Sequence, residues 1–180
     1  AASDVYKRQL LAGRGFSLSS QEPYAPDSLR TPTYPAFLAL IYAVAGPHPV
    51  AAIAVQVVLS ALTCVLTYRL GEQLWGNHEG WIAGLLLAVS PGSIVYANYL
   101  LTETLFTFLL VAACERLVAY WRGRSERDLA LVGLALGLAI LCRPIAAYLP
   151  LVMIVLVVAM HWPSIRQALR SALILALVTV

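Results

Sequence analysis

The stretch LLTETL (Leu100–Leu105) decides the fold, because it sets one carboxylate between two long apolar runs. Trp81 to Leu101 carries no charged residue, and neither does Thr104 to Cys114. Uncharged runs of this kind are candidate membrane spans, and an ionisable group at their junction is a candidate functional residue. We therefore expect Glu103 to lie at a boundary between membrane and water.

The composition indicates a polytopic membrane protein. Of the 180 residues, 61% are hydrophobic and only 12% are charged, whereas a soluble domain is usually about half apolar and a quarter charged. The net charge of +3 comes from basic residues scattered singly between apolar runs. Nucleic-acid binding needs a clustered basic face, so we expect no nucleic-acid partner.

The apolar runs predict an all-α fold, a polytopic transmembrane helix bundle with four complete spans, a fifth begun and one interfacial helix. A short run, Leu129 to Cys142, is marginal for a span, and its Gly133 and Gly137 form a small-xxx-small pair suited to close helix packing. The complete spans are expected at Val50–Tyr68, Trp81–Leu101 (interrupted at Ser90-Pro91), Glu103–Trp121 and Ile145–Trp162, and the one begun at Gln167–Val180.

The N-terminal part divides into three expected segments. Residues 1–9 (AASDVYKRQ) do not match the rest of the chain and resemble translated sequencing-adapter sequence, so we treat them as a non-native leader. Residues 10–35 are polar and rich in turn residues, which predicts a loop outside the hydrocarbon. Residues 36–46 form a helix too short to span, which we expect at the interface with Tyr34 and Tyr42 at headgroup level. Residues 50–180 hold the spans.

The arginines predict the orientation. The short loops 98–103 and 143–144 hold Arg143 alone, and the alternate set of loops is expected in the cytoplasm by the positive-inside rule. The external loop, Glu103 and Arg143 then share the extracytoplasmic face of the cytoplasmic (inner) membrane. The loops of the cytoplasmic set, 69–79, 122–128 and 163–170, contain Arg69, Arg122, Arg124, Arg127, Arg166 and Arg170.

Motifs of soluble enzymes are absent from the sequence. It has no phosphate-binding GK[ST] loop, no HExxH and no GxSxG. The three cysteines lie in separate apolar segments without a CxxC pair, which favours small buried side chains over metal or disulfide roles. No metal ligand set is expected from the three histidines either.

Five short segments, in this order, resemble bacterial relatives of the dolichyl-phosphate-mannose–protein mannosyltransferases. They are LLAGRGFS from Leu10, RTPTYPAFLA from Arg30, SP at Ser90, LTE at Leu101 and GLAILCRP from Gly137. The resemblance covers Leu10 to about Trp162. It implies a C-type glycosyltransferase, an integral membrane enzyme that moves a sugar from a polyprenyl-phosphate donor to a lipid, glycan or protein acceptor. Residues 10–180 would then be part of its transmembrane domain, within reach of membrane lipid.

The resemblance places the catalytic aspartate upstream of Leu10, in the region that the leader occupies. We therefore expect a truncated chain and do not assign that role to Asp4, which lies close to Leu10. The catalytic residue stays unknown, and four residues are candidates for substrate binding: Arg30, Tyr34, Glu103 and Arg143.

Each candidate has a simpler alternative. Glu103 contacts substrate or a divalent metal ion, or it only favours the start of a helix. Arg143 binds lipid phosphate or pairs with Glu103, or it only extends from a helix end to the interface. Arg30 is a ligand or a solvated loop charge. Tyr34 touches carrier lipid or only fixes the geometry between loop and helix.

Two other functional classes remain open. A transporter or a lipid or oligosaccharide flippase would need charges near mid-span and paired halves with discontinuous helices. A structural membrane subunit would need Glu103 and Arg143 only for stability.

Overall fold

The computed structural model describes residues 31–123, 125–160 and 165–179, and all regular structure among them is helical. In chain order the helices are α2 (Thr33–Ala45), α3 (Pro49–Leu74), α4 (Asn77–Ala88), α5 (Pro91–Asn98), α6 (Thr102–Gly123), α7 (Glu126–Cys142), the 3₁₀ helix η1 (Pro144–Tyr148), α8 (Leu149–Met160) and α9 (Ile165–Thr179). This confirms the expected all-α helix bundle.

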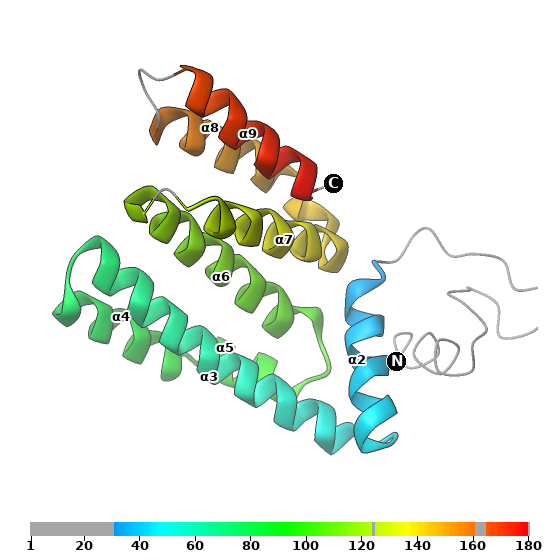
Figure 1. The fold of residues 1–180 in the computed structure, drawn as a ribbon. Coiled ribbons are helices and arrows are strands. Elements are labelled where there is room, and N and C mark those ends of the chain that lie inside the picture. Colours follow the sequence, from blue (N-terminus) through cyan, green and yellow to red (C-terminus); the bar gives the residue numbers. More distant parts are fainter. Residues whose placement is uncertain (1–30, 124, 161–164, 180) are drawn as a thin grey trace, which may run out of the picture.

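The helices pack as a stack of neighbours. Helix α3 lies along α4 and α6, α6 lies along α7, and α7 and α8 both pack on α9. Helix α2 crosses the stack at one end (Figure 1), near the start of α3 and the end of α7. The same end holds the α5–α6 connection, so segments far apart in the sequence meet there.

Helix α2 is packed into the bundle. It ends at Gly46, whose φ of 77° lies in the left-handed region that glycine adopts without strain, as Gly46-Pro47 predicts. Tyr34 and Tyr42 are only 2% and 3% exposed and pack with α3, α6 and α7. This face of α2 therefore covers the other helices, and the two rings pack inside the bundle, while the expected headgroup level of α2 stays a prediction.

Prolines divide two of the expected runs. Ser90 has an extended backbone and Pro91 opens α5, so α4 and α5 meet at an angle of 51°. Arg143 is also extended, with φ −145° and ψ 116°, and Pro144 starts the next helical turn. The residue before a proline is disfavoured in the α region, which explains why α7 stops at Cys142.

Two described helices, α3 and α6, are long and apolar enough to cross a membrane, and the bent pair α4–α5 would make a third. The sequence predicts four complete spans, and the one that differs is Ile145–Trp162. Helix α7, marginal in the sequence, has 17 residues, about 26 Å against a hydrocarbon core of about 30 Å. Helix α8 has 12 residues, and residues 161–164 lie outside the described part of the chain.

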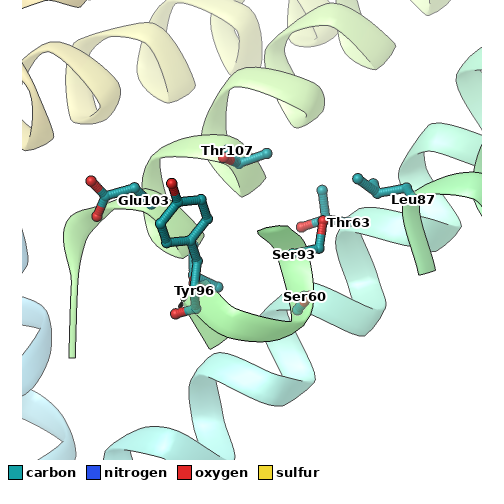
Figure 2. A pocket seen from close by; sticks show the side chains of 8 residues that line it. Ser60, Thr63, Leu87, Ser93, Tyr96, Glu103 and Thr107 are labelled. Carbon is teal, nitrogen blue, oxygen red and sulfur yellow. Dashed lines mark hydrogen bonds between the residues drawn. The ribbon is translucent and has the colours of Figure 1, made fainter. Parts of the chain in front are cut away.

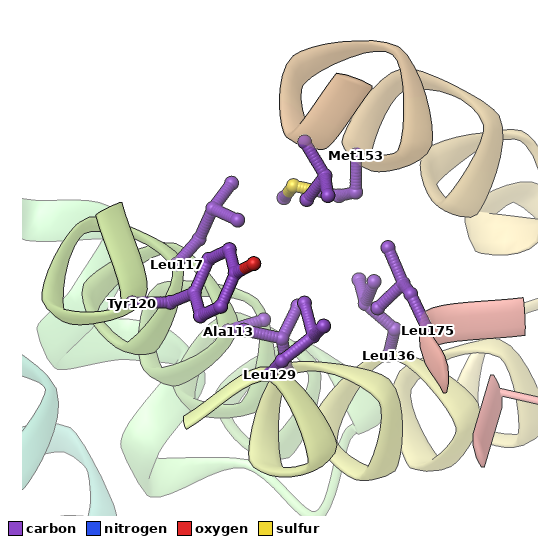
Figure 3. Packing of buried hydrophobic residues seen from close by; sticks show 9 residues of the cluster. Ala113, Leu117, Tyr120, Leu129, Leu136, Met153 and Leu175 are labelled. Carbon is purple, nitrogen blue, oxygen red and sulfur yellow. The ribbon is translucent and has the colours of Figure 1, made fainter. Parts of the chain in front are cut away.

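The larger apolar core joins the second half of the chain. Leucines of α6, α7 and α9 pack there around Ala113 and Met153 (Figure 3). A Cβ added at Gly133 would lie 2.8 Å from the Val178 Cβ of α9, and one added at Gly137 would lie 3.1 Å from the Thr179 carbonyl oxygen. The two glycines therefore serve close packing, as their spacing predicts.

Candidate functional site

Glu103 and Arg143 form an ion pair at the end of the bundle that α2 crosses. Arg143 Nη1 lies 3.4 Å from Glu103 Oε1, and the side chains are 41% and 28% exposed. Glu103 sits in the first turn of α6, where the free backbone N–H groups favour a negative charge. Arg143 occupies the extended break between α7 and η1. The structure thus brings together two candidates that the sequence places on separate helices.

Two further contacts orient the charged groups. The Thr102 hydroxyl lies 3.4 Å from Glu103 Oε2 and donates to it. The Arg143 guanidinium carbon lies 5.7 Å from the centre of the Phe106 ring, within the range of a cation–π contact. The carboxylate and the guanidinium are therefore both held, yet each keeps part of its surface open.

The two turns that carry the pair are also tied to each other. Cys142 donates its thiol hydrogen to the Thr102 carbonyl oxygen, with sulfur and oxygen 3.7 Å apart. The Thr31 hydroxyl in turn donates to the Cys142 carbonyl oxygen at 2.9 Å. The segment before α2, the start of α6 and the end of α7 are thus joined through Cys142.

Of the other candidates, Tyr34 lies below this surface and Arg30 lies outside the described residues. Burial raises the pKa of Tyr34 well above its ordinary value, and the nearby Tyr42, Cys142 and Glu103 add to the shift. The Tyr34 hydroxyl is therefore neutral at physiological pH. With 2% of its surface exposed, Tyr34 supports the site from within the bundle.

A small cavity of about 50 Å³ lies between α3, α4, α5 and α6. Hydroxyl side chains line it, among them Thr63 and Ser93, while the Glu103 carboxylate points away from them (Figure 2). Thr104 donates its hydroxyl hydrogen to the Tyr96 carbonyl oxygen at 2.9 Å. The space suits a few water molecules and is too small for a sugar ring.

An apolar groove of about 480 Å³ lies between α2, α6 and α7. Pro32 lines it and follows Thr31, which contacts Cys142. Its lining is almost wholly hydrocarbon, which suits an apolar chain better than a sugar. The residues around it are Pro32, Thr33, Ala36, Phe37, Leu40, Leu105, Leu109 and Leu138.

Two buried polar groups were not singled out by the sequence. Gln56 on α3 is 0% exposed, and its Nε2 donates to the Leu101 carbonyl oxygen at 3.1 Å. Glu115 on α6 is 2% exposed and pairs with Arg116, and Gln73 Nε2 donates to its Oε1 at 3.0 Å. In the sequence, both residues could have been found by the same signal, which is a polar side chain inside an otherwise apolar run.

A metal site of ordinary composition is not found among the described side chains. No group of three or more His, Cys, Asp and Glu there could hold an ion. Glu103 is a single carboxylate whose two oxygens already meet Arg143 and Thr102. The divalent ion that the sequence leaves open for Glu103 would therefore need further ligands from outside these residues.

Comparison with known proteins gives one match. The family model described as dolichyl-phosphate-mannose-protein mannosyltransferase matches residues 29–180, which is most of the chain. Neither the curated proteins nor the solved structures gave a match. The matched residues include α2, both turns that carry the ion pair and every helix described above.

Proposed function

The chain belongs to the dolichyl-phosphate-mannose–protein mannosyltransferase family, and we propose that it transfers a sugar from a polyprenyl-phosphate carrier to a lipid, glycan or protein acceptor. The enzyme is a membrane glycosyltransferase in this proposal. The observation that carries the site is the 3.4 Å ion pair of Glu103 and Arg143, half open at one end of the bundle.

Arg143 suits the phosphate of such a donor. Its guanidinium stays charged at any physiological pH and offers a planar fork of N–H donors that matches phosphate oxygens. One of its nitrogens faces Glu103, and 41% of the side chain is exposed. A phosphate that approaches this end would therefore meet a guanidinium already oriented by Glu103 and Phe106.

Glu103 suits the hydroxyl of the acceptor or of the transferred sugar. A carboxylate accepts hydrogen bonds from hydroxyl groups, and when Arg143 turns to phosphate an oxygen of Glu103 becomes available for one. Its Oε2 is already oriented by Thr102. In this proposal Glu103 binds substrate, and the catalytic residue stays unassigned.

The apolar groove gives the carrier a place for its chain. Pro32 in its wall follows Thr31, whose hydroxyl contacts Cys142 just before Arg143, and the other walls come from α2, α6 and α7. A polyprenyl phosphate has its charge at headgroup level and its chain in hydrocarbon, so an arginine beside an apolar groove matches both parts. Arg30, close in sequence to Thr31, is proposed as a second ligand for the phosphate.

We propose that this end of the bundle faces away from the cytoplasm. Arg69, Arg122 and Arg127 lie at the opposite end, where α3 and α6 finish and α7 begins. In this proposal the segment before α2 is an external loop, α2 with Gly46 lies at the interface, and residues 50–180 hold the spans of the cytoplasmic membrane. The break between α4 and α5 resembles a transporter's discontinuous helix, but Ser90, Pro91 and Gly92 carry no charge for an ion or substrate.

Sugar transfer in membranes tests the assignment. The donor is a polyprenyl-phosphate mannose, and the variants are Glu103→Gln and Arg143→Ala, with Arg122→Ala at the far end as the matched control. We expect each site variant to lose at least about tenfold in transfer rate, since both remove a charged contact to substrate, at equal protein level. Transfer at the wild-type rate in both variants would remove the site assignment.

A further inference from the structure

Gln56 is a buried amide that the proposed chemistry does not use. It is 0% exposed on α3, in a run without charged residues. An amide buried without partners is destabilising, because it gives up its hydrogen bonds to water. Its Nε2 recovers part of that loss with the 3.1 Å hydrogen bond to the Leu101 carbonyl oxygen. The side chain therefore ties α3 to the connection between α5 and α6.

That connection leads directly into the candidate site. Leu101 is the last residue before α6, and Glu103 lies in the first turn of that helix. The next carbonyl oxygen, that of Thr102, accepts from the Cys142 thiol. Successive carbonyls of this turn are thus held by α3 on one side and by α7 on the other.

The remaining atoms of Gln56 point to a second partner. Gln56 Oε1 and the Tyr34 hydroxyl are both buried, and neither has a direct hydrogen-bond partner among the described side and main chains. Hydrogen bonding from Gln56 nevertheless lowers the pKa of Tyr34, against the larger raising effect of burial, so the amide lies close to the phenol oxygen.

We propose that Gln56, with Tyr34 behind it, is a positioning residue that sets the Leu101–Glu103 turn so that the Glu103 carboxylate meets Arg143. Gln56 touches no substrate and acts only through Glu103. Tyr34 links Gln56 to α2. Residues of α2, α3, α6 and α7 then all help to position the Glu103 carboxylate. The role in transfer rests on the proposed function, whereas the role in placing the turn does not.

A labelling experiment tests the placement without any enzymatic activity. The chain carries Glu103→Cys in a background of Cys64→Ala, Cys114→Ala and Cys142→Ser, where serine keeps a donor for Thr102. Gln56→Met removes the amide at similar length, and Thr67→Val is the matched control, since the Thr67 hydroxyl bonds only within α3. We expect Gln56→Met to raise the maleimide labelling rate at position 103 at least about threefold, and the control to leave it unchanged. An unchanged rate in Gln56→Met overturns the proposal.

A double-variant cycle in sugar transfer tests the link to Glu103. Gln56→Met alone should lower kcat about tenfold, and by no more than Glu103→Gln does, because it misplaces a substrate-binding carboxylate. In a Glu103→Gln background the same change should cost nothing further, because the group it positions is already altered. Losses that multiply in full would show that Gln56 acts elsewhere, and would overturn this role. If the wild type transfers no sugar, the proposed function fails, and the labelling rate alone decides the role of Gln56.

Discussion

The Glu103 carboxylate and the Arg143 guanidinium meet at 3.4 Å across two helix ends that stop for different reasons. Helix α6 starts just before Glu103, after the connection from α5, while α7 stops at Cys142 because Pro144 follows Arg143. Both charged side chains leave the backbone at a helix end, where they reach the surface without crossing the apolar faces. The ion pair therefore forms because the start of α6 and the end of α7 lie next to each other.

The ion pair should contribute little to stability. Because 41% and 28% of the two side chains are exposed, water screens the attraction, and such pairs are worth about 0–1 kcal/mol. We expect Glu103→Gln to change the free energy of unfolding in detergent by less than about 1 kcal/mol. Denaturant unfolding followed by tryptophan fluorescence measures it. A loss well above that range would favour a purely structural role for the pair.

The orientation can be checked by labelling from outside intact cells. Single cysteines at Glu103 and at Asn77, which opens α4 at the opposite end, are compared in a background of Cys64→Ala, Cys114→Ala and Cys142→Ser. We expect an impermeant maleimide to label position 103 in intact cells and position 77 only after lysis, because arginines mark the cytoplasmic loops. The reverse pattern would place the ion pair in the cytoplasm and contradict the proposed active face.

The sequence predicts the helix ends and the charged pair better than the packing. Gly46, Pro91 and Pro144 act on the backbone itself, so their effects are local and the helix ends that they cause can be predicted from the sequence. Arg143 as a partner of Glu103 follows from two charges at span ends on one side. The burial of Tyr34 and the contacts of Gln56 could not be predicted from the sequence. A membrane helix is apolar on every face, so the periodicity of its apolar residues does not show which face packs against other helices.

Close contact between α3 and α4 depends on glycine. A Cβ added at Gly80 would lie 2.6 Å from the Tyr68 carbonyl oxygen and 2.8 Å from the Glu72 backbone nitrogen, neither of which can move without shifting α3. We expect Gly80→Ala to lower stability by about 1–3 kcal/mol, the range for overpacking. Gly123→Ala is the control, since nothing lies within 4 Å of its Cβ position. Thermal unfolding in detergent compares them, and equal melting temperatures would show that α3 and α4 are not this close.

Removing Arg116 and removing Glu115 from the ion pair of α6 should cost different amounts of stability. Glu115 is 2% exposed, whereas Arg116 is 34% exposed and also reaches Asp128 Oδ1 at 3.1 Å. Arg116→Ala leaves a buried charge with only Gln73 beside it, which should cost about 3–5 kcal/mol. Glu115→Ala leaves an arginine that keeps Asp128 and water, so we expect a smaller loss.

Comparing the stability lost in Arg116→Ala with that lost in Glu115→Ala tests which of the two charged groups is costly to bury. Denaturant unfolding of Arg116→Ala, Glu115→Ala and the double variant measures it, with Arg122→Ala as a control for removing a basic residue from the same helix. We expect the double variant to be more stable than Arg116→Ala alone, because it no longer buries an unpaired carboxylate. A double variant less stable than either single one would mean that Glu115 stabilises the bundle through contacts other than Arg116.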